Sequence, residues 1–300
     1  MTTLKSICLL GFGEVGQILA EDLAASGIRF ISAYDIKFND PASVPSRALK
    51  RFQVEARESA AATVAGADLV ISAVTAAATA DAARDAKGGL KAGAYYLDLN
   101  SASPSHKQEA ARVIEAAGGR YVEGAVMSPI SPLRMAAPIL LGGPHAEGFL
   151  DKAKRLGFSG TEVFSDQVGP AAATKLCRSV VVKGMEALLT ESLLAARRYG
   201  VEDTVLQSLD NMFPLGDWEK RARYMISRSL EHGQRRAEEM REAARTVDES
   251  GVDPLMSEAT ATRQDWASAF KAAATEAQLI PMLDAILKEV RLPEPRKNKQ

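Results

Sequence analysis

The chain has 300 residues, of which 46% are hydrophobic and 25% are charged, and its formal net charge is -1. This composition indicates a soluble globular protein with room for two domains, and the charge excludes a nucleic-acid surface that works by bulk charge. Two cysteines without CxxC or Cys/His spacing predict no metal site and a reduced, cytoplasmic setting. We expect neither a membrane span nor a signal peptide, because no apolar stretch is long enough and a strand begins within the first residues.

A glycine-rich turn follows the first predicted strand. The apolar run 7–10 leads into Gly11-Phe12-Gly13-Glu14-Val15-Gly16, which opens a segment of helical periodicity. Gly11 suits a tight turn, Gly13 the approach of a pyrophosphate, and Gly16 close packing of the helix on the sheet. Backbone N–H groups and the helix dipole would then face the phosphates. The stretch therefore predicts a dinucleotide-binding site.

An acid ends the second predicted strand, at 30–34. Asp35 would accept hydrogen bonds from the ribose hydroxyls and repel a 2′-phosphate, which favours NAD. Lys37 is near enough in sequence to leave NADP open.

Further apolar runs predict strands at 67–74, 95–99, 121–126 and 139–141, and a short helix at 46–52. Strands that alternate with helices imply an α/β fold, here a doubly wound, mostly parallel Rossmann sheet with helices on both faces. We place this dinucleotide-binding domain at residues 1–166, with the strand at 139–141 closing the sheet.

Residues 167–300 are predicted to form an all-α domain for substrate binding and dimerisation. Helical periodicity covers 171–198, 206–212, 218–249, 255–275 and 279–290. Six large apolar residues exceed what one helical layer comfortably hides, which predicts a homodimer through this domain. They are Trp218, Met225, Leu230, Met240, Trp266 and Phe270.

Ligands of a doubly wound sheet bind at the carboxyl ends of its strands. Three loops there carry small hydroxyl or amide groups: Thr75, which follows Val74, in one, Asn100 and Ser101 in the next, and Ser128 in the third. We expect Val74, Thr75 and Asn100 to contact the cofactor. Ordinary turn chemistry would also explain the Ser-Pro runs in these loops.

Lys175 follows a run of small residues early in the long helical segment. Arg178 and Ser179 stand three and four residues on, so the three side chains share a helix face. A lysine serves as a general acid or base where burial and a neighbouring cation lower its pKa. An arginine can hold a carboxylate with two hydrogen bonds. This face therefore suits a small carboxylate substrate.

A second polar stripe combines His232, Arg235, Arg236 and Glu239. It fits either a salt-bridged, exposed helix face or an anion-facing wall of a cleft, and the sequence leaves both open.

Three stretches match the motifs of one family. Its glycine motif falls on 11–16, its Asp-x-Ser-Thr-x-x-Pro loop on 98–104, and its Gly-x-Gly-x-Ala-x-Lys motif on 169–175. The sequence thereby resembles the β-hydroxyacid dehydrogenase superfamily, which includes 3-hydroxyisobutyrate dehydrogenase and 6-phosphogluconate dehydrogenase. Within it, the chain looks like the branch with a phosphogluconate dehydrogenase-like C-terminal domain of unknown function.

The resemblance implies hydride transfer between a nicotinamide and a small 3-hydroxy acid, with Lys175 as the general acid or base. Ser101, Ser128, Arg178 and Ser179 would then position the substrate. The chain departs from the family at Ala171, which replaces a glycine, and at Arg178-Ser179, which replace an Asn-Asn pair. Ser128 fits the family's Pro-Val-Ser-Gly-Gly loop only with a shift of one residue, and Glu238-Glu239 replace a Lys-Asp pair.

The sequence leaves three alternatives open. The same fold could support a decarboxylating, phosphogluconate-type dehydrogenase or an imine reductase. A non-catalytic NAD-binding sensor would need the glycine turn and Asp35 but not Lys175.

Overall fold

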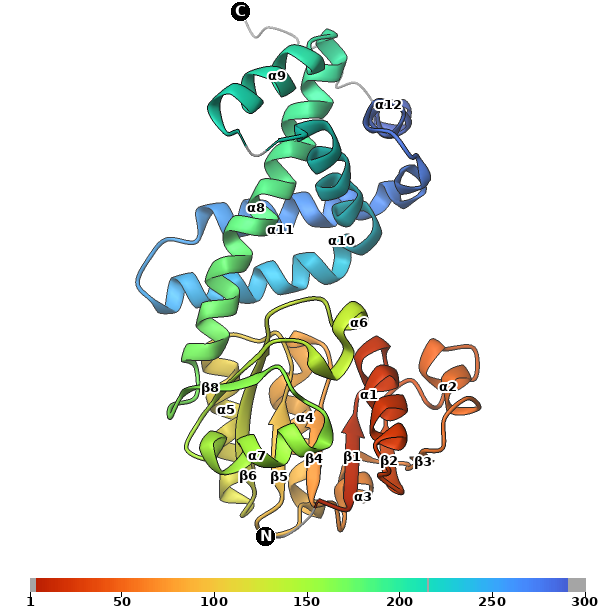
Figure 1. Ribbon diagram of the computed structural model, residues 1–300, viewed down its shortest axis with the longest axis vertical. Coiled ribbons are helices and arrows are strands. Elements are labelled where there is room, and N and C mark those ends of the chain that lie inside the picture. Colours follow the sequence, from red (N-terminus) through yellow and green to blue (C-terminus); the bar gives the residue numbers. More distant parts are fainter. Residues whose placement is uncertain (1–3, 215, 291–300) are drawn as a thin grey trace, which may run out of the picture. The chain divides into compact units, whose positions relative to one another are not determined.

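The computed structural model describes residues 4–214 and 216–290 (Figure 1). The chain divides into two compact units, Met1–Cys177 with Glu249–Gly251 and Arg178–Asp248 with Val252–Gln300. The first contains the sheet and the second is helical. None of the helices in the described ranges is long and apolar enough to cross a membrane.

The first unit is built on one eight-stranded sheet of order β3-β2-β1-β4-β5-β6-β7-β8. Every neighbouring pair is parallel except β6 and β7. This confirms the predicted doubly wound, mostly parallel Rossmann sheet. The strands are β1 (Ser6–Leu10), β2 (Phe30–Tyr34), β3 (Glu55–Ala56), β4 (Leu69–Ser72), β5 (Tyr95–Asp98), β6 (Arg120–Val126), β7 (Ile139–Gly142) and β8 (Thr161–Ser165).

Helices cover both faces of the sheet, so alternate residues of the central strands enter two different cores. In β1, Ile7 and Leu9 join α1 (Glu14–Ala25) and α7 (Ala146–Leu156) in one core. Cys8 and Leu10 join α3 (Ala60–Val64), α4 (Thr79–Ala86) and α5 (Pro104–Ala116) in the other. Each fully buried aliphatic side chain contributes about 1.5–3 kcal/mol. Burial on both faces explains why these strands read as continuous apolar runs.

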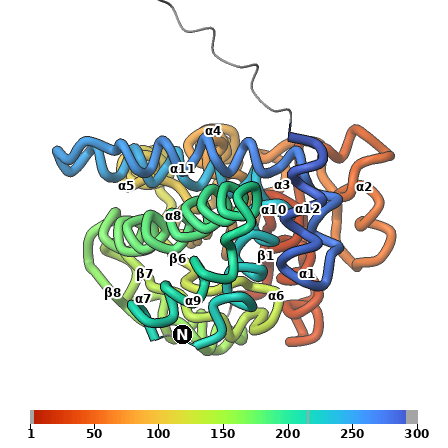
Figure 2. Tube along the Cα trace, turned by 90° about the horizontal axis from the view of Figure 1, so that it is seen from above, coloured from red at the N-terminus to blue at the C-terminus, as the bar shows by residue number. Residues whose placement is uncertain are grey.

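The second unit is formed by helices that Figure 2 follows in green and blue. Its core includes Leu193, Ile226 and Leu283, and Arg197 forms a bidentate pair with Asp284, both N···O distances being 2.7 Å. The helices are α8 (Pro170–Tyr199), α9 (Glu202–Met212), α10 (Trp218–Glu249), α11 (Leu255–Ala267), a 3-10 segment η4 (Ser268–Thr275) and α12 (Leu279–Glu289). The helix α8 begins in the first unit and continues into the second.

The sequence missed the edges of the sheet. The strand at 139–141 is not the last, because β8 pairs with it, and β3 also escaped detection. Glu162 and Phe164 of β8 are exposed, so this edge strand lacks the continuous apolar run of the central strands. The short helix α2 spans Val44–Leu49 rather than 46–52, since Ser43 caps its start with Pro45 in its first turn. Another short helix, α6 (Ile130–Leu133), follows β6.

The six large apolar residues from which the dimer was predicted are buried or packed within one chain, so they do not support a dimer. Trp218, Leu230 and Phe270 are buried in the core of the helical unit, and Met225 and Trp266 pack against it. Met240 is also buried. Five of the six side chains therefore belong to, or pack against, one core to which α8, α10, η4 and α12 contribute.

Candidate active site

The glycine turn has the geometry that its sequence predicts. Gly11 adopts a φ of +91°, and its N–H donates to the carbonyl of Tyr34 at 2.8 Å. A Cβ atom on Gly16 would lie 2.2 Å from the carbonyl oxygen of Gly11, so the helix could not pack this closely with a larger residue. Gly13 instead faces open space among the described residues. The turn is thus tight at both ends and accessible in the middle.

The start of α1 fits a dinucleotide phosphate. Within the described part of the chain, no side chain caps this helix end, which leaves the positive end of the dipole for an anion. Glu14 is exposed and Val15 is half-buried, whereas Phe12 is fully buried against Phe38 and Phe52. The Phe12 ring therefore belongs to the core and does not face a cofactor.

Asp35 ties the end of β2 to the glycine turn. Its Oδ2 accepts the N–H of Phe12 at 2.8 Å, and its Oδ1 accepts the N–H of Lys37 at 2.9 Å. A carboxylate oxygen has two acceptor sites, so each oxygen retains one for a ribose hydroxyl. The carboxylate is thus held in place and still able to bind.

Asn100 has a structural task that the sequence did not reveal. Its Oδ1 accepts the N–H of Val74 at 2.7 Å, and its Nδ2 donates to Ser72 Oγ at 3.0 Å. These two hydrogen bonds tie the buried Asn100 side chain, which follows β5, to the end of β4 and to the loop after it. Exposed Thr75 follows Val74 in the first of these loops. We infer that Asn100 shapes the predicted cofactor loop through Val74.

Lys175 and Ser101 are brought together. The Lys175 Nζ lies 2.6 Å from Ser101 Oγ and donates a hydrogen bond to it, although 74 residues separate the two. Lys175 lies on the second turn of α8, and Ser101 follows β5. Both side chains are half-buried. An amine held beside a hydroxyl at a strand-end loop is an arrangement suited to proton transfer.

The other predicted substrate residues are placed separately. Ser128 follows β6 and donates to the carbonyl of Pro129 at 3.2 Å. Arg178 and Ser179 lie further along α8, in the helical unit, where Arg178 is exposed and Ser179 is buried. The Ser179 hydroxyl accepts a hydrogen bond from Lys183 at 3.2 Å.

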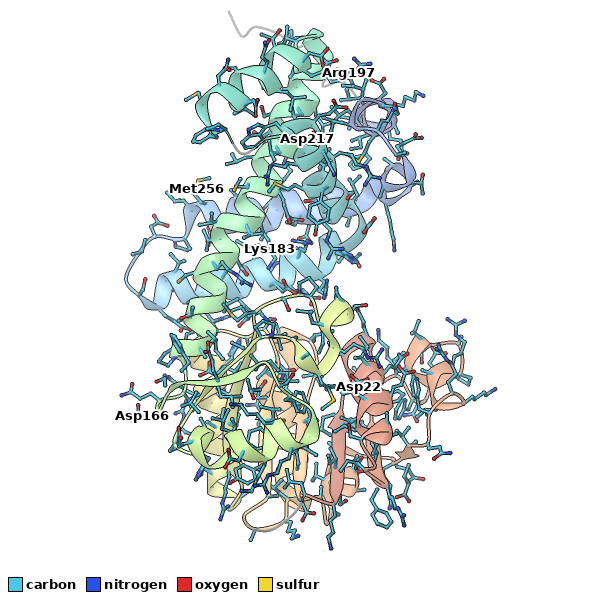
Figure 3. The ribbon with its side chains drawn as sticks, in the orientation of Figure 1. Asp22, Asp166, Lys183, Arg197, Asp217 and Met256 are labelled. Carbon is cyan, nitrogen blue, oxygen red and sulfur yellow. The ribbon has the colours of Figure 1, made fainter. Side chains whose placement is uncertain are left out.

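The second polar stripe is engaged inside the helical unit. Glu239 pairs with Lys183, labelled in Figure 3, at 2.6 Å. Arg236 pairs with buried Glu186 at 2.6 Å. Burial raises the pKa of the Glu186 carboxyl, and the Arg236 charge opposes that rise. The salt-bridged alternative therefore holds for Arg236 and Glu239, but their side chains are largely buried rather than exposed.

His232 marks a kink within α10, with φ of −125° and ψ of 16°. Its Nε2 lies 2.8 Å from Arg228 Nη1. Burial, together with the charges of Arg228 and Arg235, holds the pKa of His232 below its ordinary value. The imidazole is therefore disposed to stay neutral.

A buried charged cluster beneath the site was missed by sequence reasoning. Lys107 and Asp98 are each 1% exposed and pair at 2.8 Å, and Tyr121 donates its hydroxyl to Asp98 Oδ2 at 2.7 Å. Glu123 is 0% exposed and accepts backbone N–H groups from the start of α8. Burial raises the pKa of both Glu123 and Tyr121. The sequence did contain a signal for this cluster, because Asp98 and Glu123 are charged residues within the otherwise apolar strands β5 and β6.

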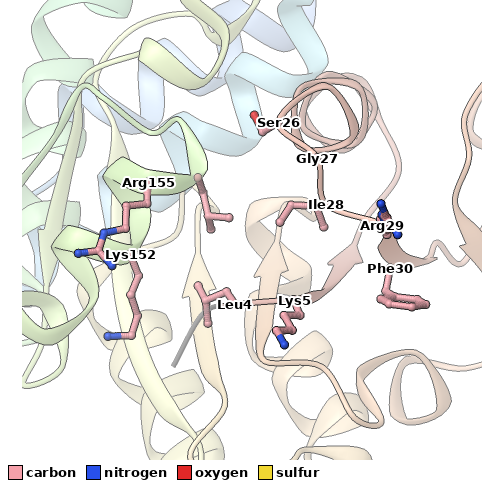
Figure 4. Close-up of a pocket in the computed structure, with 10 residues that line it drawn as sticks. Leu4, Lys5, Ser26, Gly27, Ile28, Arg29, Phe30, Lys152 and Arg155 are labelled. Atoms are coloured by element: carbon pink, nitrogen blue, oxygen red, sulfur yellow. The ribbon is translucent and has the colours of Figure 1, made fainter. Parts of the chain in front are cut away.

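A hollow of about 380 Å³ lies at the amino-terminal ends of β1 and β2, on the side of the sheet away from the glycine turn (Figure 4). It is lined by Leu4 and Lys5 before β1, by the loop between α1 and β2, and by the end of α7. Gly11 and Ser101 follow the carboxyl ends of their strands, so the hollow is separate from the candidate active site.

Comparisons with known proteins agree with this geometry. Residues 6–148 match the NAD binding domain of 6-phosphogluconate dehydrogenase, and residues 196–267 match a domain of unknown function (DUF1932). The chain therefore has an NAD(P)-binding dehydrogenase fold. It belongs to the β-hydroxyacid dehydrogenase superfamily, in the branch that carries this C-terminal domain, which confirms the resemblance seen in the sequence.

Three solved structures illustrate the likeness. A conserved hypothetical protein from Sinorhizobium meliloti 1021 is 34% identical, with 96% of this chain and 98% of that chain covered and a TM-score of 0.73. The conserved protein MTH1747, of unknown function and described as similar to 3-hydroxyacid dehydrogenases, is 29% identical over 95% and 100% of the two chains, with a TM-score of 0.68. The 3-hydroxyisobutyrate dehydrogenase of Mycobacterium tuberculosis shares the fold at 16% identity, 95% and 99% coverage and a TM-score of 0.68.

Proposed function

We propose that the protein is an NAD(P)-dependent dehydrogenase that oxidises a small 3-hydroxy acid or reduces the corresponding 3-oxo acid. The observation that carries this proposal is the 2.6 Å hydrogen bond between Lys175 Nζ and Ser101 Oγ at the carboxyl edge of the sheet. This hydrogen bond brings together residues of two family motifs, although Lys175 and Ser101 are 74 residues apart in the sequence. A sensor that only binds a dinucleotide would not need this pair.

Lys175 acts on the substrate proton in this scheme. A bound nicotinamide supplies the hydride acceptor for oxidation. The neutral amine of Lys175 takes the proton of the substrate hydroxyl, and the ammonium form returns it during reduction. Ser101 holds the amine through its hydroxyl oxygen and can donate its own proton to the substrate oxygen. Arg178 is proposed to hold the substrate carboxylate, with Ser128 and Ser179 as further polar contacts.

We infer that NAD is the preferred cofactor. Asp35 is fixed by the backbone N–H groups of Phe12 and Lys37 and keeps acceptor capacity for the ribose hydroxyls. A 2′-phosphate would meet its negative charge. Gly11 to Gly16, with Val74 and Thr75, would line the remainder of the dinucleotide site.

We also propose a homodimer through the α-helical domain, with α8 at the interface. Val181 and Leu188 of α8 are exposed by 62% and 60% and stand seven positions apart, on one helix face. Charged replacement of both should yield a monomeric mass in light scattering, while the wild type gives a dimeric mass. A monomeric wild type would contradict the proposed dimer.

Free Cys8 and Cys177 support a reducing, cytoplasmic location.

The reaction is tested with purified protein, NAD or NADP, and a panel of 3-hydroxy acids of increasing size. Formation of reduced cofactor is followed by its absorbance. The panel should contain acids with one and with two carboxylates, together with 2-hydroxy acids as a matched chemical control. Turnover confined to 3-hydroxy acids supports the proposal. Dinucleotide binding without turnover of any acid in either direction would favour the sensor.

A further inference from the structure

Glu123 is the starting point, because its buried carboxylate reaches the helix that carries Lys175. Its Oε2 accepts the N–H of Gly169 at 2.8 Å, and its Oε1 accepts the N–H of Ala172 at 2.7 Å. The intervening Pro170 has no N–H to donate. Both oxygens thus cap the first turn of α8 from a strand 46 residues away, where a negative charge also meets the positive end of the helix dipole.

The fold makes room for this carboxylate. Gly142 of β7 stands opposite Glu123 in the antiparallel register, and a Cβ atom there would lie 2.5 Å from Glu123 Oε2. Gly169 has a φ of +125°, which turns its N–H toward the carboxylate in a conformation that other residues rarely adopt. A glycine on each side therefore permits the close approach.

Asp98 is the cross-strand neighbour of Glu123 in the parallel pairing of β5 and β6. Its Oδ1 accepts the backbone N–H of Asn100 at 2.9 Å, one residue before Ser101. Lys107 donates to the same oxygen at 2.8 Å and to the Asp98 carbonyl at 2.9 Å. Asp98 thereby fixes the loop that presents Ser101, just as Glu123 fixes the helix that presents Lys175.

Nearby positive charge explains how two buried carboxylates can lie on neighbouring strands. Lys107 neutralises Asp98 directly and lowers the cost of ionising Glu123. The N–H groups of Gly169 and Ala172 supply further positive potential. A buried charge set of this kind persists only when its geometry is well satisfied.

We propose that Asp98, Lys107 and Glu123 form a positioning unit that sets the hydrogen bond between Lys175 and Ser101. Asp98 anchors the serine side and Glu123 anchors the lysine side, while Lys107 pairs with Asp98 and its charge favours the ionised form of Glu123. None of the three touches the substrate; each acts through the backbone of α8 or of the loop after β5. The inference rests on the proposed role of Lys175, which it deepens.

Glu123→Gln is the sharpest perturbation. Glutamine keeps the size of the side chain, but its NH₂ group is a donor and would face one of two backbone N–H groups. One of the two hydrogen bonds to Gly169 and Ala172 is then lost, and the glutamine NH₂ group faces that backbone N–H, which is also a donor. Losing a charge-assisted hydrogen bond corresponds to roughly a 10-fold to 100-fold change in a local opening equilibrium. Glu123→Asp keeps the charge with a shorter reach and should give a smaller effect.

Glu115→Gln is the matched control. Glu115 also accepts a backbone N–H, that of Tyr121 at 2.9 Å, and lies 3.2 Å from His145 Nε2 in the first unit. Both variants remove one negative charge from a glutamate that binds a main-chain amide in the same unit. Glu115→Gln therefore controls for the loss of a carboxylate that accepts a main-chain N–H elsewhere in the first unit.

The test measures hydrogen–deuterium exchange of the full-length wild type and variants in a peptide covering residues 168–176. Labelling of Lys175 by reductive methylation is measured on the same proteins, relative to the remaining lysines. Glu123→Gln should accelerate exchange by roughly 10-fold to 100-fold and raise the relative labelling of Lys175 several-fold, while Glu115→Gln changes neither. Wild-type exchange in Glu123→Gln would overturn the proposal, as would faster exchange without a change at Lys175.

Neither measurement needs a substrate, so failure of the proposed function remains distinguishable. Where a 3-hydroxy acid is turned over, Glu123→Gln should lower kcat by roughly 10-fold or more and leave the affinity for NAD unchanged. An unchanged kcat would overturn the positioning role. If no acid is turned over, exchange and labelling still decide whether Glu123 positions Lys175.

Discussion

Replacing Lys107 with methionine should destabilise the first unit more than any surface charge change. Lys107 and Asp98 are each 1% exposed and 2.8 Å apart, so the variant leaves Asp98 buried without its cation and removes the charge that offsets Glu123. Breaking a buried pair from one side typically costs about 3–5 kcal/mol. For a unit of this size, that loss lowers the unfolding midpoint by roughly 6–20 °C.

The pair formed by Lys91 and Asp68 supplies the control. Its N···O distance is a similar 2.7 Å, but its side chains are 52% and 22% exposed, so Lys91→Met should cost no more than about 1 kcal/mol. Urea unfolding of the full chain, followed by circular dichroism, measures both variants. Asp98→Asn combined with Lys107→Met should recover part of the loss, because the unpaired charge is removed as well. Equal costs for Lys107→Met and Lys91→Met would refute the reasoning.

Three further outcomes follow from the structure. Asp35→Ser should narrow the preference for NAD over NADP in binding titrations, because the charge that repels a 2′-phosphate is lost; tighter NADP binding by the wild type would contradict this. His232 has a folded pKa below its unfolded value of about 6.5, so its stabilising contribution is present above about pH 6.5 and is lost as pH falls through the folded pKa. His232→Gln should therefore flatten the decline of the unfolding midpoint between about pH 7 and about pH 5.5, and an unchanged slope would count against it. Arg178→Ala should raise the Michaelis constant for the acid roughly 10-fold to 100-fold with a smaller effect on kcat, and a selective loss of kcat would assign Arg178 another role.

The sequence predicted the centre of the fold better than its margins. Central strands such as β4 are buried on both faces and therefore appear as apolar runs, and helices such as α10 have buried positions recurring on both sides of the kink at His232. Edge strands such as β8 show no such apolar run, because alternate residues of β8 are exposed to solvent. The antiparallel pairing of β6 and β7 leaves no mark in either strand, since direction depends on the connection between them.

The candidate site was predicted only as far as local motifs reach. The glycine turn, Asp35 and Lys175 each stand in a recognisable stretch. Glu123 does not, because its task depends on Gly169 and Ala172, which approach it only after the sheet and α8 have formed. Long-range capping by a buried acid has no sequence spacing that would reveal it.

Lys175→Ala provides the most direct test of the central claim that this lysine moves the substrate proton. With NAD and the 3-hydroxy acid that the wild type turns over best, kcat should fall by roughly 100-fold to 10,000-fold. NAD affinity and the unfolding midpoint should stay at wild-type values, and exposed Lys271→Ala should retain full activity. Lys175→Arg should not restore turnover, because a guanidinium keeps its proton. Near-normal kcat in Lys175→Ala would contradict the account.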